Sequence, residues 1–208
     1  MRILELKPSQ RGKGRFLLKL EDGTTLRVTE DELLHFRLSA GMELGDGDLE
    51  ALRASAGASA AKAAAVNIIG NRALSKRELT GRLLKKGAAQ ADAQAAAGWL
   101  EEIGALDDAA YAAALVRHYG AKGCGPARVR EELRRRGVDR ELWDGALEEL
   151  PEAGEALDAL IRKKCRGDLS DPKEKKRLSD ALLRRGFSWS DVRAAMARYT
   201  DMLEDDYG

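Results

Sequence analysis

The first 29 residues alternate apolar and polar positions with the two-residue period that is typical of β-strands. The apolar positions fall into three short runs. The last two runs are separated by Asp22-Gly23, a dipeptide that favours a tight hairpin turn. Thr29 and Glu32 then have the spacing of a capping box, which predicts that a short helix begins directly after Thr29. The pattern therefore predicts a small antiparallel sheet of three strands, followed by a helix.

From about Leu49 to Met202 the apolar positions change to the period of α-helices. Three of the predicted helices end at a glycine, and the glycines are Gly87, Gly137 and Gly186. The residues eight and four positions before each glycine are all apolar: Leu79, Leu83, Val129, Leu133, Leu178 and Leu182. The glycines are 50 and 49 residues apart, so the chain carries an internal repeat. Each repeat would contain a short helix, a glycine turn, a second helix and a linking helix.

The starts of these helices are marked by ordinary capping signals. Ser75 and Glu78 have capping-box spacing, and Pro126 and Pro172 each stand where the first helical residue is expected.

The alanine-rich segment 54–65 is compatible with either a helix or a flexible connector.

Together these patterns predict a mostly α-helical protein of tandem three-helix repeats. The expected architecture is an elongated, curved array with a small N-terminal antiparallel β region. The expected divisions are 1–53 for the β region with its short helix, 54–107 for repeat 1, 108–152 for repeat 2, and 153–208 for repeat 3 with an acidic C-terminal tail.

Composition argues against several classes of protein. The charged fraction is 34%, above the usual ~25%, and aromatic residues make up only 5%. The chain has no apolar run long enough to span a membrane, and residues 1–30 lack the apolar stretch of a secretion signal. Cys124 and Cys165 are far apart in the sequence and form no CxxC pair. We therefore expect a cytoplasmic protein without a disulfide framework or a membrane partner.

No catalytic constellation is present in the sequence. It contains no P-loop, no HExxH and no GxSxG motif, and its only histidines are His35 and His118. Asp107 and Asp108 resemble a helix cap and a first-turn acid more than a metal pair. We therefore expect no catalytic residue, no metal site, no cofactor and no enzymatic activity.

The net charge of +1 conceals an uneven distribution of charge. Residues 120–140 hold seven basic and three acidic residues, and residues 162–186 hold ten basic and four acidic residues. One or two cations suffice to offset the dipole at a helix end, and Arg128 and Arg130 lie at a predicted helix start, where the dipole disfavours them. A solvated surface is one interpretation. The other is an anionic partner bound by Lys85, Lys86, Arg128, Arg130, Arg134, Arg135, Arg136, Lys175, Lys176, Arg184 and Arg185.

Four segments, taken in order, resemble the RecX family of regulatory proteins. "GPARVREELRRRGV" at 125–138 is similar to the central motif of that family, with its Arg-aliphatic-Arg triplet and basic-Gly-Val turn. The other three are "SKRELTGRLLKKG" at 75–87, "LDDAAYAAALVRHY" at 106–119 and "DPKEKKRLSDALLRRGFSWSDVRAAM" at 171–196. The resemblance covers about 65–200, and the β region is similar to extensions carried by longer members.

The resemblance implies a regulator of the RecA recombinase that is not an enzyme. Such a protein would bind the RecA–DNA nucleoprotein filament in its groove, as a monomer, and would contact the single- or double-stranded DNA within it. It would restrain RecA ATP hydrolysis, strand exchange and co-protease activity. The alternative function from the residues alone is a free-standing nucleic-acid-binding module made of helical repeats.

Overall fold

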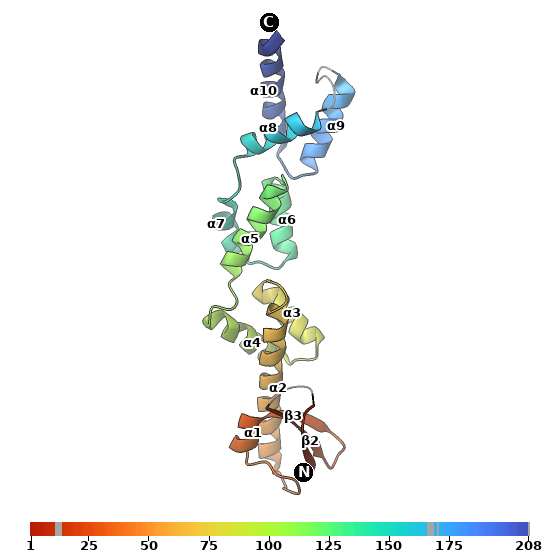
Figure 1. The fold of residues 1–208 in the computed structure, drawn as a ribbon, viewed down its shortest axis with the longest axis vertical. Coiled ribbons are helices and arrows are strands. Elements are labelled where there is room, and N and C mark those ends of the chain that lie inside the picture. Colours follow the sequence, from red (N-terminus) through yellow and green to blue (C-terminus); the bar gives the residue numbers. More distant parts are fainter. Residues whose placement is uncertain (11–13, 166–168, 170, 208) are drawn as a thin grey trace. The chain divides into compact units, whose positions relative to one another are not determined.

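The structure is a computed structural model that describes residues 1–10, 14–165, 169 and 171–207 (Figure 1). The chain divides into two compact units, Met1–Leu106 and Asp107–Gly208, and each unit has its own hydrophobic clusters. The described part is mostly α-helical with one three-stranded antiparallel sheet, which confirms the predicted fold class.

The N-terminal sheet has the strand order β1-β2-β3. The strands are β1 (Ile3–Pro8), β2 (Arg15–Leu20) and β3 (Thr25–Thr29). The predicted hairpin turn joins β2 and β3. Its Gly23 has a φ of 84°, a conformation that glycine adopts readily, and the Asp22 carboxylate accepts a hydrogen bond of 2.8 Å from the Thr24 amide.

A buried carboxylate ties the end of this sheet to the first long helix. Helix α1 (Glu30–His35) begins with the predicted capping box, in which Thr29 caps the amide of Glu32. The Glu32 side chain is only 4% exposed, and it accepts hydrogen bonds from the hydroxyl groups of Ser55 at 2.8 Å and Ser59 at 2.7 Å. Because both serines lie on α2 (Asp46–Ile69), the β region is docked against that helix (Figure 1).

Helix α2 is continuous across the alanine-rich segment 54–65, so the flexible-connector interpretation of that segment is wrong. Its first half packs on the sheet, where Leu49 and Leu52 join Leu18 and Leu20 in one buried cluster. Its second half packs with α3 (Lys76–Lys85) and α4 (Gln90–Glu102) to form the first three-helix bundle. One helix therefore serves both the sheet and the first repeat.

The second unit contains two further three-helix bundles. The first is formed by α5 (Asp108–Ala121), α6 (Pro126–Arg135) and α7 (Trp143–Leu147), with a 3-10 turn, η1 (Arg140–Leu142), leading into α7. The second bundle is formed by α8 (Ala153–Lys164), α9 (Pro172–Leu183) and α10 (Trp189–Tyr207). The repeat that the sequence predicted is therefore a repeat of the structure.

The three terminal glycines adopt the left-handed conformation that ends helices. Gly87, Gly137 and Gly186 have φ angles of 89°, 71° and 89°. The predicted caps are also present: Ser75 accepts from the Glu78 amide, Asp107 accepts from the Ala110 amide, and Pro126 and Pro172 open their helices. No helix in the part of the chain that the structure describes combines the length and the apolar character needed to cross a membrane.

Candidate functional site

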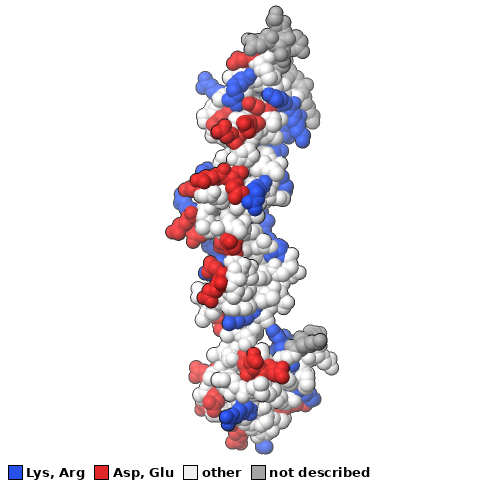
Figure 2. All heavy atoms as spheres, turned by 60° about the vertical axis from the view of Figure 1, so that its left-hand side comes forward, with Lys and Arg blue, Asp and Glu red and all other residues white. Residues whose placement is uncertain are grey.

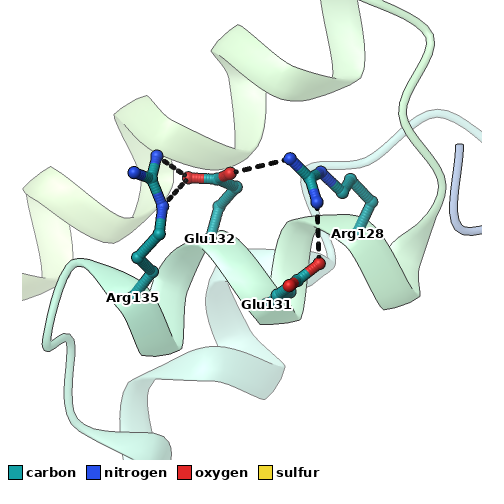
Figure 3. Close-up of polar contacts among 4 residues, drawn as sticks. All are labelled: Arg128, Glu131, Glu132 and Arg135. Carbon is teal, nitrogen blue, oxygen red and sulfur yellow. Dashed lines mark hydrogen bonds and ion pairs between the residues drawn. The ribbon is translucent and has the colours of Figure 1, made fainter.

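The basic cluster predicted at 128–136 is organised around a buried carboxylate on α6. The Glu132 side chain is 4% exposed and lies between two arginines of the same helix (Figure 3). Arg128 donates to it over 3.2 Å, and the Nε of Arg135 donates over 2.9 Å. Arg128 also donates to Glu131 over 2.8 Å. Two of the predicted binding residues therefore hold a carboxylate of their own helix.

The charge state of Glu132 follows from these contacts. Burial raises the pKa of its carboxyl group, but hydrogen bonds from Arg135 and Tyr119 and the positive charges of Arg135 and Arg128 lower the pKa by more, so that it lies below its ordinary value. Glu132 is therefore ionised at neutral pH and holds both arginine side chains against α6.

The lowered pKa of Glu132 predicts a loss of stability in acid. A folded-state pKa below the unfolded value of about 4.3 stabilises the fold above that pH, and the stabilisation is lost as the pH falls through the folded pKa. Glu132→Gln should reduce the difference in unfolding free energy between pH 7 and pH 3, as measured by urea denaturation of both proteins. An unchanged difference would contradict this account of the Glu132 contacts.

Two other arginines of α6 remain available to a partner. Arg130 and Arg134 are exposed, and neither makes an ion pair with any residue that the structure describes. They are four residues apart on a helix, so their side chains lie on the same face. We call them the α6 basic pair. Arg136, just beyond the helix, is half-buried and takes part in an interaction within the chain.

Five other predicted residues lie on α3 and α9, in repeats 1 and 3. Lys85 and Lys86 are exposed at the end of α3, Lys175 and Lys176 are exposed on α9, and Arg184 is exposed at its end. None of these five side chains forms an ion pair with a residue in the described ranges. They provide separate basic positions in repeats 1 and 3.

Arg185 has a structural role at the junction of repeats 2 and 3. Its guanidinium donates to the backbone carbonyls of Lys122 at 2.7 Å and Gly123 at 2.9 Å, which follow the end of α5. The backbone carbonyls of Arg185 and Gly186, in the turn between α9 and α10, accept hydrogen bonds from the amides of Gly125 and Ala127. The turn between α9 and α10 is therefore fixed against the start of α6.

Beside this junction lies a pocket that the sequence did not indicate. Its volume is about 470 Å³. Apolar side chains from Pro151, Ala156 and Leu160 line it, together with the basic residues Lys122, Lys163 and Lys164. Lys163 and Lys164 belong to the basic stretch at 162–186, but no sequence pattern separates them from other surface lysines.

On the face that Figure 2 shows, acidic and basic residues are interspersed within each unit. Binding of an anionic partner would therefore depend on local groups such as the α6 basic pair, because cations that are mixed with carboxylates give only a weak long-range field.

Known proteins resemble the chain in sequence and in fold. The family model for the second three-helix domain of RecX matches residues 107–147, and the model for the third matches residues 152–196. A "Regulatory protein RecX" of Xanthomonas axonopodis pv. citri (strain 306) is 35% identical over 133 residues, which is 63% of this chain and 82% of the relative. Another, from Halorhodospira halophila (strain DSM 244 / SL1), is 34% identical over 146 residues, or 69% of this chain and 91% of the relative.

Solved structures agree on the fold. A crystal structure of regulatory protein RecX superposes with a TM-score of 0.71 at 23% identity, covering 94% of this chain and 98% of the other. RecX from Lactobacillus salivarius superposes with a TM-score of 0.60 at 17% identity, covering 70% and 97%. The sequence identity and coverage of the relatives, with the two matching domain models, show that this chain belongs to the RecX family of regulatory proteins.

Proposed function

We propose that this protein binds the RecA–DNA nucleoprotein filament and restrains RecA ATP hydrolysis, strand exchange and co-protease activity. The observation that carries the proposal is the α6 basic pair, two exposed arginines without a described ion-pair partner, in a domain that matches the RecX family. The family membership points to RecA as the partner, and the exposed cations suit a surface built from DNA phosphates and protein carboxylates.

The construction of α6 supports this assignment. Because Glu132 binds Arg128 and Arg135, these two side chains are held on one side of the helix, while Arg130 and Arg134 lie on another. Cations that already have an ion-pair partner have part of their charge neutralised and fewer free donors for a phosphate, whereas the α6 basic pair has neither restriction. The pair therefore offers the stronger contribution to filament binding.

A second candidate function is a free-standing nucleic-acid-binding module. Exposed basic residues in all three repeats favour it, namely Lys85, Lys86, Lys175, Lys176 and Arg184 with the α6 basic pair. This function requires tight binding to DNA in the absence of RecA, with an affinity that falls steeply as the salt concentration rises.

The proposed function is tested by ATP hydrolysis. RecA is assembled on single-stranded DNA, and the rate of ATP hydrolysis is measured as the purified protein is added. We expect the rate to fall to a low plateau, and the heat-denatured protein to have no effect. A rate that stays constant at saturating protein would contradict the proposed function. A rate that falls only when the added protein covers all the DNA would favour the free-standing module.

A further inference from the structure

One large aromatic side chain has no role in the cores described above. Trp189, the first residue of α10, is 59% exposed. The other two tryptophans are half-buried. Trp143 donates its indole N–H to the carbonyl of Val138 at 3.1 Å, and Trp99 packs against the first bundle beneath Lys62. An exposed indole leaves a large apolar surface in water, which is typical of residues that bind a partner.

Trp189 lies at a pocket between α9 and α10, with a volume of about 260 Å³. Val192, Met196 and Ala197 supply apolar lining, and the hydroxyl groups of Ser179 and Thr200 are already hydrogen-bonded to their own helices. The pocket therefore presents an aromatic ring and an apolar floor to a ligand.

Two cations line the same pocket as this ring. Lys175 on α9 and Arg193 on α10 line the same pocket, and neither forms an ion pair with any residue in the described part of the chain. Among the side chains that the structure describes, no carboxylate lines the pocket. The nearby Asp191 is hydrogen-bonded to the Ser188 hydroxyl at the start of α10. A pocket that holds an aromatic face and two cations matches the two parts of a nucleotide, a base and a phosphate.

We propose that Trp189, Lys175 and Arg193 form a binding site for an unpaired nucleotide of a single strand. The base would stack on the indole ring, and Lys175 and Arg193 would bind the flanking phosphates. Both faces of a base within a duplex are covered by its neighbours, so the site selects single-stranded over double-stranded nucleic acid. This inference deepens the proposed function and rests on it for its biological setting, but the binding itself needs no RecA.

The site is tested with two oligonucleotides of equal length, an oligothymidylate and an abasic strand that has the same phosphates but no bases. Trp189→Ala should weaken oligothymidylate binding by about tenfold and leave abasic binding unchanged, because only the stacking contact is removed. Trp189→Phe keeps an aromatic face and should retain most of the affinity. Lys175→Gln with Arg193→Gln should weaken binding of both strands to the same extent, because phosphates are common to both.

Fluorescence provides a second measurement on the same proteins. Oligothymidylate should quench the tryptophan emission of the wild-type protein, and this quenching should disappear in Trp189→Phe, which retains Trp99 and Trp143. Circular dichroism of each variant reports whether the helices are intact.

The proposal is overturned if the wild-type protein does not bind oligothymidylate, or if folded Trp189→Ala binds it as tightly as the wild type. Equal loss of abasic binding in that variant would also overturn it. Binding of an acidic, leucine-containing peptide is measured as well. If Trp189→Ala loses binding of this peptide but keeps binding of oligothymidylate, the site is a protein-docking surface instead. If the wild-type protein binds the oligonucleotide as expected but leaves RecA ATP hydrolysis unchanged, the proposed function fails and the nucleotide site stands.

Discussion

Replacing Arg130 and Arg134 together by glutamate should abolish inhibition of RecA ATP hydrolysis at protein concentrations where the wild type is fully inhibitory. Both side chains are exposed and make no described ion pair, so the change removes two attractive contacts and introduces two repulsive ones. We expect the concentration for half-inhibition to rise by about tenfold or more. Circular dichroism should show intact helices, because neither side chain belongs to the buried core of the bundle that contains α6.

A matched control is available in the same unit. Arg117 and Arg198 are exposed arginines of other helices that pair with Glu149 and Asp158. Arg117→Glu with Arg198→Glu makes the same change in net charge and should leave inhibition close to that of the wild type. Equal loss of inhibition in both double variants would mean that only overall charge matters. Full inhibition by the folded Arg130→Glu/Arg134→Glu protein would show that the α6 basic pair does not contribute to inhibition.

Gly186→Ala should destabilise the second unit far more than Gly87→Ala destabilises the first. Both glycines have a φ of 89°, so alanine costs about 1–2 kcal/mol at either position. A Cβ at Gly87 meets nothing within 4 Å, whereas a Cβ at Gly186 would lie 2.3 Å from the backbone nitrogen of Arg128. The clash should add about 1–3 kcal/mol at Gly186 alone, because the backbone must move to relieve it.

Amide hydrogen exchange can measure the destabilisation in each unit separately. A global unfolding experiment is less suitable, because a chain with two units need not unfold in one step. The amides of Gly125 and Ala127 are hydrogen-bonded to the turn that contains Gly186. Their exchange should accelerate strongly in Gly186→Ala and remain unchanged in Gly87→Ala. Similar exchange at these two amides in both variants would contradict the close packing of this junction.

Local patterns were sufficient to predict much of the fold. The hairpin at Asp22-Gly23, the cap at Thr29 and the glycine turns depend on the conformational preferences of a few adjacent residues, and the structure contains all of them. The segment 54–65 was ambiguous because nearly uniform alanine gives no contrast between buried and exposed faces. Its helix is covered by the sheet and by α4, and these contacts are long-range.

The candidate site was predictable only as a set of basic residues. The internal pairing of Arg128 and Arg135 has a local signal, since Glu132 lies four residues after one and three before the other. The role of Arg185 has none, because its carbonyl partners are more than 60 residues away in the sequence. Arg136 was grouped with Arg134, yet it is half-buried just beyond the helix. Which cations remain available therefore depends on tertiary contacts.

We expect the protein to bind the assembled RecA–DNA filament and not either of its components alone. Co-sedimentation at physiological salt tests this expectation with three samples: RecA on single-stranded DNA, RecA without DNA, and DNA alone. We predict that most of the protein sediments with the RecA–DNA filament and much less with either component. Equal recovery with naked DNA, or no recovery with the filament, would contradict the account.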